Sequence, residues 1–148
     1  MTWAAQGVFA LPCGSGGGGA AEAYGITLNP DATTTSDSVF EQIGNLLLNV
    51  SVGEARAAVI SLTGTATNLT ADHRTEFKVS VDGAELDEVC VILAITGEDQ
   101  GTVAVTGQTT LSPGPHVVRA VFRTQSGGTG SALTNQLHLE VIVAQAVP

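Results

Sequence analysis

Charged residues are scarce in this sequence, since only 13% of its 148 residues are Asp, Glu, Lys or Arg and only 4% are aromatic. A typical soluble domain is about one-quarter charged. A chain far below that value tends to bury part of its exterior against copies of itself or against partners. The composition therefore predicts one domain that works in an oligomer or a larger assembly.

Basic residues are the scarcest class: there are five, against 14 acidic ones, and the formal net charge is -9. Binding to nucleic acid depends on clustered Lys and Arg that displace phosphate counterions, so neither nucleic acid nor an anionic membrane is an expected partner. No apolar run approaches the ~20 residues that span a bilayer. Residues 1–13 are apolar but lack a basic segment and an unbroken hydrophobic stretch, so they are interpreted as mature sequence.

Only two cysteines are present, Cys13 and Cys90, and they do not make a disulfide framework. Both are expected to be reduced thiols. His73, His116 and His138 have no ligand-type partner at useful spacing, and no serine or cysteine lies in a nucleophile motif. The sequence predicts no enzyme, no metal and no cofactor. His116 follows a turn, and its expected role is to bind backbone and fix that turn.

Glycine, in contrast, is abundant at residues 14–19, which read Gly-Ser-Gly-Gly-Gly-Gly. Such a stretch holds no regular structure because glycine has the largest backbone entropy to lose. It predicts an N-terminal arm and linker over residues 1–19 and a β-sandwich domain over residues 20–148. The arm is expected to bind a neighbouring subunit or partner through Trp3, Val8, Phe9 and Leu11; a frayed terminus is the alternative.

The rest of the chain has a β pattern, with short stretches of Val, Ile, Thr and Leu cut by Gly, Pro, Asn and Asp about every ten residues. We expect about eight strands in an antiparallel, jelly-roll-like β-sandwich that carries an extended N-terminal arm. An immunoglobulin-type pattern of two cysteines around a buried Trp is missing. The expected strands are residues 34–43, 46–52, 56–68, 76–81, 88–95, 102–110, 116–124 and 134–143, and 88–95 is expected to be covered on both faces.

The strand at residues 116–124 has two contrasting faces. Its apolar face consists of Val118, Ala120 and Phe122. The other face mixes valine with arginine, which makes a poor core and a good interface. We predict partner binding there by Val117, Arg119, Val121 and Arg123. Plain solvent exposure, with cross-strand partners such as Glu76 or Glu140, is an equal alternative.

The order of several short motifs resembles the small jelly-roll modules of tailed-bacteriophage virion proteins, which are similar in shape to trimeric C1q- and TNF-like jelly rolls. The resemblance rests on the segments Thr-Thr-Thr-Ser-Asp-Ser at 33–38, Val-Asp-Gly at 81–83, Leu-Ser-Pro-Gly-Pro-His-Val-Val-Arg-Ala-Val-Phe-Arg-Thr at 111–124, Ser-Gly-Gly-Thr at 126–129 and Leu-His-Leu-Glu-Val-Ile at 137–142. Pro115 departs from the usual small polar residue before the histidine. The resemblance implies a location in the virion and threefold assembly.

Two functions follow from these expectations. The first is a capsid decoration (cement) protein that binds the major capsid protein on the capsid exterior as a homotrimer and stabilises the shell. The alternative is a receptor- or glycan-binding tip of a tail fibre or head spike, with binding by loops 96–101 or 125–133. A lectin-like site usually has aromatic platforms, and the few aromatic residues here fall mostly at apparent core positions, so decoration is preferred.

Overall fold

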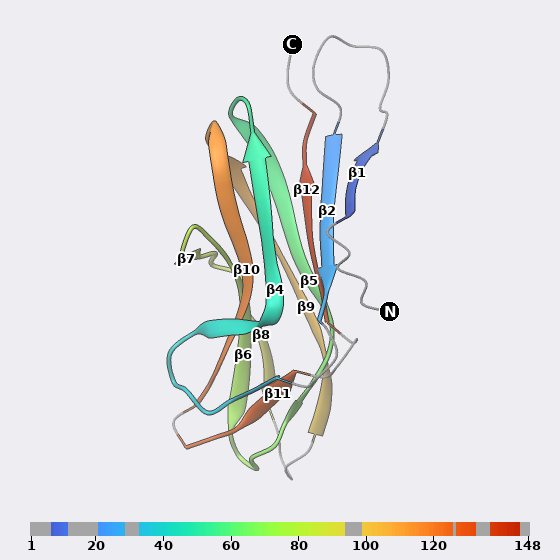
Figure 1. Cartoon of the computed structure of the whole chain (residues 1–148). Coiled ribbons are helices and arrows are strands. Elements are labelled where there is room, and N and C mark those ends of the chain that lie inside the picture. The colour runs from blue at the N-terminus through green and yellow to red at the C-terminus, as the bar shows by residue number, and fades with distance from the viewer. Residues whose placement is uncertain are drawn as a thin grey trace.

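The chain folds into two antiparallel β-sheets that pack face to face (Figure 1). The computed structural model describes residues 7–11, 21–28, 33–93, 99–125, 127–132 and 137–145, and these residues contain twelve strands and no helix. The seven-stranded sheet contains β1 (Gly7–Leu11), β2 (Ala21–Thr27), β3 (Thr33–Thr35), β5 (Arg56–Asn68), β9 (Asp99–Leu111), β11 (Gly130–Ala132) and β12 (His138–Val143). The five-stranded sheet contains β4 (Glu41–Val52), β6 (Arg74–Val81), β7 (Ala84–Glu85), β8 (Cys90–Leu93) and β10 (Gly114–Thr124).

The strand pairing is nested, which defines the topology. The outermost pair is β2 with β12, followed inward along the chain by β4 with β10, β5 with β9 and β6 with β8. Such nested pairing is what results when one long antiparallel hairpin rolls up into two sheets, as in a jelly roll. The predicted fold class is therefore confirmed: these eight strands build the sandwich, and the short strands β1, β3, β7 and β11 extend it.

Most expected strands appear within a few residues of their predicted bounds, and 56–68 coincides with β5. The predicted break at residues 44 and 45 is not a strand end, because β4 continues through it as an irregularity opposite the region between Arg119 and Val121 of β10. Gly44 has a φ of 46° there, a conformation that glycine adopts without penalty. Strand β2 was missed, because Ala, Gly and Glu give it little intrinsic strand character.

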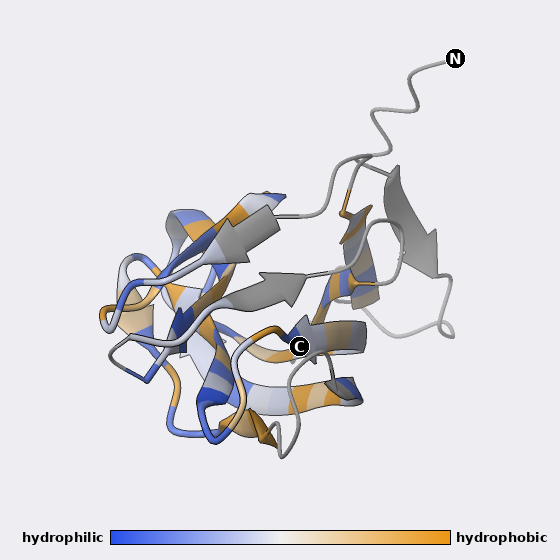
Figure 2. Cartoon of the chain, turned by 90° about the horizontal axis from the view of Figure 1, so that it is seen from below, coloured by the Kyte–Doolittle hydropathy of each residue, from blue (hydrophilic) through white to orange (hydrophobic). Residues whose placement is uncertain are grey.

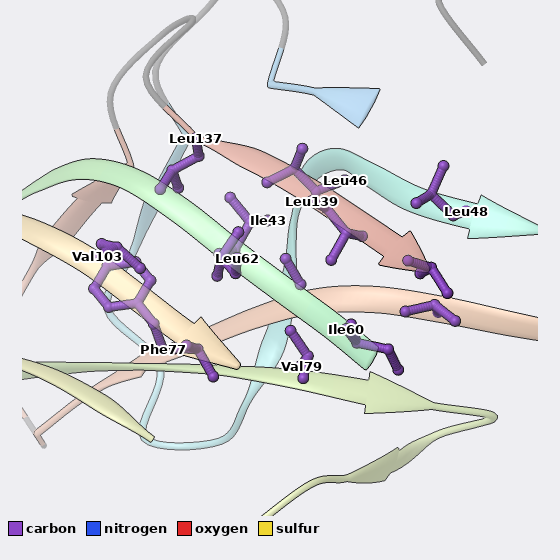
Figure 3. Packing of buried hydrophobic residues seen from close by; sticks show 14 of the residues in the cluster. Ile43, Leu46, Leu48, Ile60, Leu62, Phe77, Val79, Val103, Leu137 and Leu139 are labelled. Carbon is purple, nitrogen blue, oxygen red and sulfur yellow. The ribbon is translucent and has the colours of Figure 1, made fainter. Parts of the chain in front are cut away.

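The core lies between the two sheets and is almost entirely aliphatic (Figure 3). The strands alternate as the period-2 pattern predicts, so Val118, Ala120 and Phe122 of β10 are fully buried. Phe122 contacts Phe77 of β6 with their ring centroids 6.1 Å apart. The seven-stranded sheet contributes, among others, Ile60, Leu62, Val103, Leu139 and Val141.

The side of the sandwich between β9 and β6 is closed by the segment that includes β8. Two glycines of β9 make room for it: a Cβ on Gly107 would lie 2.6 Å from Leu86 Cδ1, and one on Gly101 would lie 3.0 Å from Ile92 Cγ1. Strand β8 itself is not covered on both faces, contrary to the prediction for 88–95. Val91 and Leu93 are 46% and 60% exposed, because no described segment packs over the outer side of this edge strand.

Residues 7–11, part of the predicted arm, form the edge strand β1 and pair with β2 from Gly7 opposite Gly25 to Leu11 opposite Ala21. Residues 7–11 are thus extended, as expected of the arm, and lie along the domain. Trp3 and the glycine-rich residues 14–19 lie outside the described residues, and the side chains of Val8, Phe9 and Leu11 are not described. The boundary after residue 19 and the binding role of the arm stay predictions.

Candidate interaction surfaces

The outer face of the five-stranded sheet carries the four interface residues predicted on β10. This strand is central, between β4 and β6, so Val117, Arg119, Val121 and Arg123 point away from the core in one row. Val121 is only 6% exposed although it does not belong to the core cluster, so it is covered from the outer side. The structure brings these four residues onto one surface, as the alternation predicted.

Arg123 has a carboxylate partner across the strand pair. Its guanidinium donates from Nε to Glu76 Oε2 on β6, and it also lies over the ring of Phe40, 4.4 Å from the centroid. Arg74 Nη2 lies 3.5 Å from the other carboxylate oxygen of Glu76. The alternative interpretation, solvent exposure with cross-strand partners, correctly named Glu76 as a partner of an arginine on this face. Glu140 was wrong as a partner, because it lies on β12 in the other sheet.

Arg119 and Lys78 are placed differently. Arg119 donates from Nε to the uncharged Gln42 Oε1 at 3.1 Å, and Lys78 Nζ lies 5.7 Å from the Phe40 ring centroid. Neither forms an ion pair with a carboxylate within the described part of the chain. Both positive charges therefore remain available on the outer face, held in place by neutral neighbours.

The turn role predicted for His116 is confirmed at one end of this sheet. Its Nε2 lies 2.7 Å from the Ser112 carbonyl oxygen and its Nδ1 lies 2.7 Å from Asp82 Oδ2. Asp82 and Gly83 form the tight turn between β6 and β7, both with positive φ, and Asp82 Oδ1 accepts the Val117 backbone N–H at 2.8 Å. This corner ties the start of β10 to the end of β6.

Both titratable groups of the corner are shifted toward their charged forms. Acceptance of a ring proton by the Ser112 carbonyl, followed by the contact with Asp82, raises the pKa of His116. The hydrogen bond from His116, followed by the one from the Val117 amide, lowers the pKa of Asp82. Since both ring nitrogens face acceptors, the imidazolium form satisfies the site best. The arrangement is a structural clamp between the two strand ends.

The outer face of the seven-stranded sheet is a second surface, which the sequence analysis did not single out. Its residues are small or uncharged, and Glu140 is the one carboxylate among those described. Strand β2 contributes Ala23, Gly25 and Thr27, and β12 contributes His138, Glu140 and Ile142. Strand β5 contributes Ala57, Val59, Ser61, Thr63, Thr65 and Thr67, and β9 contributes Thr102, Ala104, Thr106, Gln108 and Thr110. The sequence does contain a signal for this face, because Thr recurs at every second position in part of β5 and at every fourth position in β9. Figure 2 shows the alternation of hydrophilic and hydrophobic residues along the strands.

A partly buried polar network fastens one end of the seven-stranded sheet. Arg56, only 8% exposed, donates from Nε to the Ala144 carbonyl at 2.6 Å and lies 3.7 Å from Glu22. Tyr24 donates its hydroxyl to Glu22 at 2.7 Å. Burial, together with this bond, raises the pKa of Tyr24 to about 12. Arg56 thus joins β2, β5 and the residues after β12, and it is structural.

The remaining candidates for chemistry are scattered. His73 binds the Ala71 carbonyl, His138 contacts Thr27 Oγ1 at 3.0 Å, and Cys90 is a partly exposed free thiol against the core. Within the described segments no group of three or more His, Cys, Asp or Glu is placed to hold a metal. Those segments also contain no helix long and apolar enough to cross a membrane. Cys13 lies outside the described residues.

No family model matches the chain, and no curated protein is similar to it in sequence. Among solved structures, the chain is similar to Eiger TNF from S. frugiperda, with 10% sequence identity and a TM-score of 0.48 over 85% of this chain and 94% of that chain. The fold and the surfaces define a single jelly-roll β-sandwich with two contrasting outer faces. The nested strand pairing alone defines this class of fold.

Proposed function

We propose that the chain is a structural protein of a bacteriophage virion, a capsid decoration protein that binds the outer shell as a homotrimer and stabilises it. The observation that carries the proposal is the outer face of the seven-stranded sheet, on which Glu140 is the one carboxylate among the described residues. A surface of Thr, Ala, Ser and Val can be desolvated against a copy of itself with little loss of hydration of charged groups. The proposed threefold symmetry comes from the sequence motifs, whose order resembles that of virion modules.

A glycan-binding tip is less well supported. Of the aromatic side chains that the structure describes, Phe77 and Phe122 are fully buried and Tyr24 is half-buried. Phe40 is partly exposed on the five-stranded sheet, but Lys78 and Arg123 lie over its ring. These positions leave no open aromatic platform on which a sugar ring could stack among the described residues. Attachment to a protein shell is the better match.

The test of self-association is the mass of the purified protein in solution. The chain has a mass of 15.0 kDa, so light scattering at micromolar concentration should give three times that value, 45 kDa. Thr106→Lys places a charge on the exposed outer face of β9 and should reduce the mass to that of the monomer. Gly53→Lys adds the same charge in the turn after β4, where an added Cβ meets no atom within 4 Å, and should leave the trimer intact.

A monomer at micromolar concentration would overturn the trimer. The location is tested separately by electron microscopy of virions that carry the protein. A regular lattice over the shell is expected for a decoration protein, whereas density confined to vertices or to the tail would contradict decoration and favour a fibre or spike component.

A further inference from the structure

The basic residues of this acidic protein are concentrated on one surface. The chain has five Lys and Arg residues, and all five lie in described segments. Arg56 is buried at the end of the seven-stranded sheet. The other four, Arg74, Lys78, Arg119 and Arg123, lie on strands β6 and β10 and face outward from the five-stranded sheet. A protein with a net charge of -9 thus has a local basic patch on one face.

The patch is only partly neutralised. Glu76 is its central carboxylate and is shared by Arg74 and Arg123. Asp82 lies at its edge and is already bound to His116 and to the Val117 amide. Arg119 and Lys78 rest against Gln42 and Phe40, which are neutral. A positive potential of this kind attracts an acidic partner and sets its orientation more than its total affinity.

Exposed aliphatic side chains border the patch. Strand β8 pairs with β6 and presents Val91 opposite Glu76 and Leu93 opposite Arg74, on the same outer side. Val89, just before the strand, is 47% exposed, and Val91 and Leu93 are 46% and 60% exposed. Within the described chain β8 pairs with no strand other than β6, and its Ile92 carbonyl accepts a hydrogen bond from Asn68 Nδ2 at 3.4 Å.

We propose that this surface, defined by Arg74, Lys78, Arg119, Arg123, Val91 and Leu93 and here named the basic face, binds an acidic segment of a partner protein that also carries aliphatic side chains. Charge complementarity selects the acidic residues, and the rim formed by Val91 and Leu93 selects the aliphatic ones. A nucleic acid or an anionic polysaccharide would use the cations but leave the rim in water. The inference rests on the proposed function, since it names the face through which a decoration trimer attaches to its shell.

The probe is a labelled ten-residue peptide of alternating Glu and Val, and binding is measured by fluorescence anisotropy at pH 7 with the full-length protein. We expect saturable binding that weakens as salt rises from 50 to 300 mM, because screening acts on exposed charges. A peptide of alternating Lys and Val should not bind. Heparin, a polyanion without aliphatic side chains, should compete at least tenfold less well than the Glu–Val peptide.

The variant Lys78→Gln should weaken peptide binding about five- to tenfold, and Lys78→Gln/Arg119→Gln at least thirtyfold. Gly53→Glu shifts the net charge by the same single unit as Lys78→Gln but lies in an exposed turn away from the basic face, and it should leave binding unchanged. Leu93→Ser tests the aliphatic rim and should weaken binding about threefold to tenfold. Circular dichroism confirms the fold of each variant.

Equal losses in Lys78→Gln and Gly53→Glu would reduce the effect to net charge and overturn the basic face. Heparin that competes as well as the peptide, or an unchanged affinity in Leu93→Ser, would overturn the choice of a protein partner. A drop in mass by light scattering in the Lys78→Gln/Arg119→Gln variant would show that a second copy of the chain occupies the face, which also overturns it. Failure of the trimer itself appears as a monomer of the unchanged protein, with peptide binding still measurable.

Discussion

Thr75 on β6 and Thr124 on β10 lie directly opposite each other in the five-stranded sheet, yet only one of the two buried hydroxyls has a partner. Thr124 Oγ1 donates to the Gly128 carbonyl at 3.0 Å, within the connection that follows β10. Thr75 Oγ1 is buried without a hydrogen-bond partner in the described structure. A matched pair of substitutions follows from this difference.

Thr75→Val should stabilise the fold by about 1–2 kcal/mol, because it replaces an unsatisfied buried hydroxyl with a methyl group of the same shape. Thr124→Val should destabilise it by about 1 kcal/mol or more, since it removes the donor to Gly128 and leaves that carbonyl without this bond. Urea unfolding gives both free energies. If the two variants shifted stability in the same direction, the assignment of the satisfied and unsatisfied hydroxyls would be wrong.

The clamp between His116 and Asp82 should make stability depend on pH. The pKa of His116 is raised in the folded state, so its contribution is complete below the unfolded pKa of about 6.5 and is lost as pH rises through the folded value. The pKa of Asp82 is lowered, so its contribution is present above about 3.9 and is lost as pH falls through the folded value. The clamp therefore contributes most between about pH 4 and 6.5.

Asp82→Asn is the variant that tests the clamp, because asparagine tolerates the positive φ of this position and keeps a side-chain oxygen for the Val117 amide. The Asp82 side chain is half exposed, so we expect a loss of under ~1 kcal/mol, or about 2–4 °C in Tm. The difference in Tm from the unchanged protein should be largest near pH 5–6 and smaller at pH 8.5. A difference that does not vary with pH would contradict the role of the ion pair.

The two faces of β10 should respond differently to alanine. Phe122 is fully buried against Phe77, so Phe122→Ala should cost about 3–5 kcal/mol through the cavity it leaves. Arg123→Ala should cost under ~1 kcal/mol, since Glu76 keeps Arg74 as a partner. It should weaken binding to the shell more than folding. Thermal melting and a capsid-binding assay separate the two effects, and equal small losses in Tm would show that the faces have been exchanged.

Deletion of residues 1–19 should leave the sandwich folded, because β2 keeps its six register pairs with β12 when β1 is removed. The loss of the edge strand should cost no more than about 1–2 kcal/mol, as backbone hydrogen bonds at an edge are partly replaced by water. Binding to the shell should fall more than tenfold if Trp3, Phe9 and Leu11 bury apolar area there. Circular dichroism and a capsid-binding assay of the truncated protein test these two expectations. A lost fold would show that β1 is an essential strand of the sandwich, and unchanged binding would show that the arm does not contact the shell.

Local patterns in the sequence determined which residues enter the core and which turns are tight. The alternation in residues 116–124 separated Phe122 from Arg123, and Asp82-Gly83 marked a hairpin turn, because both signals depend only on neighbouring residues. The same local view missed β2. That strand has weak intrinsic preference and forms because β12 and β1 provide hydrogen-bond partners on both sides.

The tertiary structure alone decided which charges meet. Glu76 and Glu140 were equal candidates for Arg123 by sequence, and only the antiparallel register of β6 against β10 places Glu76 opposite it. His116 finds Asp82 across 34 positions for the same reason. The gathering of four cations on one sheet face, and of uncharged residues on the other, depends on which strands share a sheet, a long-range outcome that periodicity does not contain.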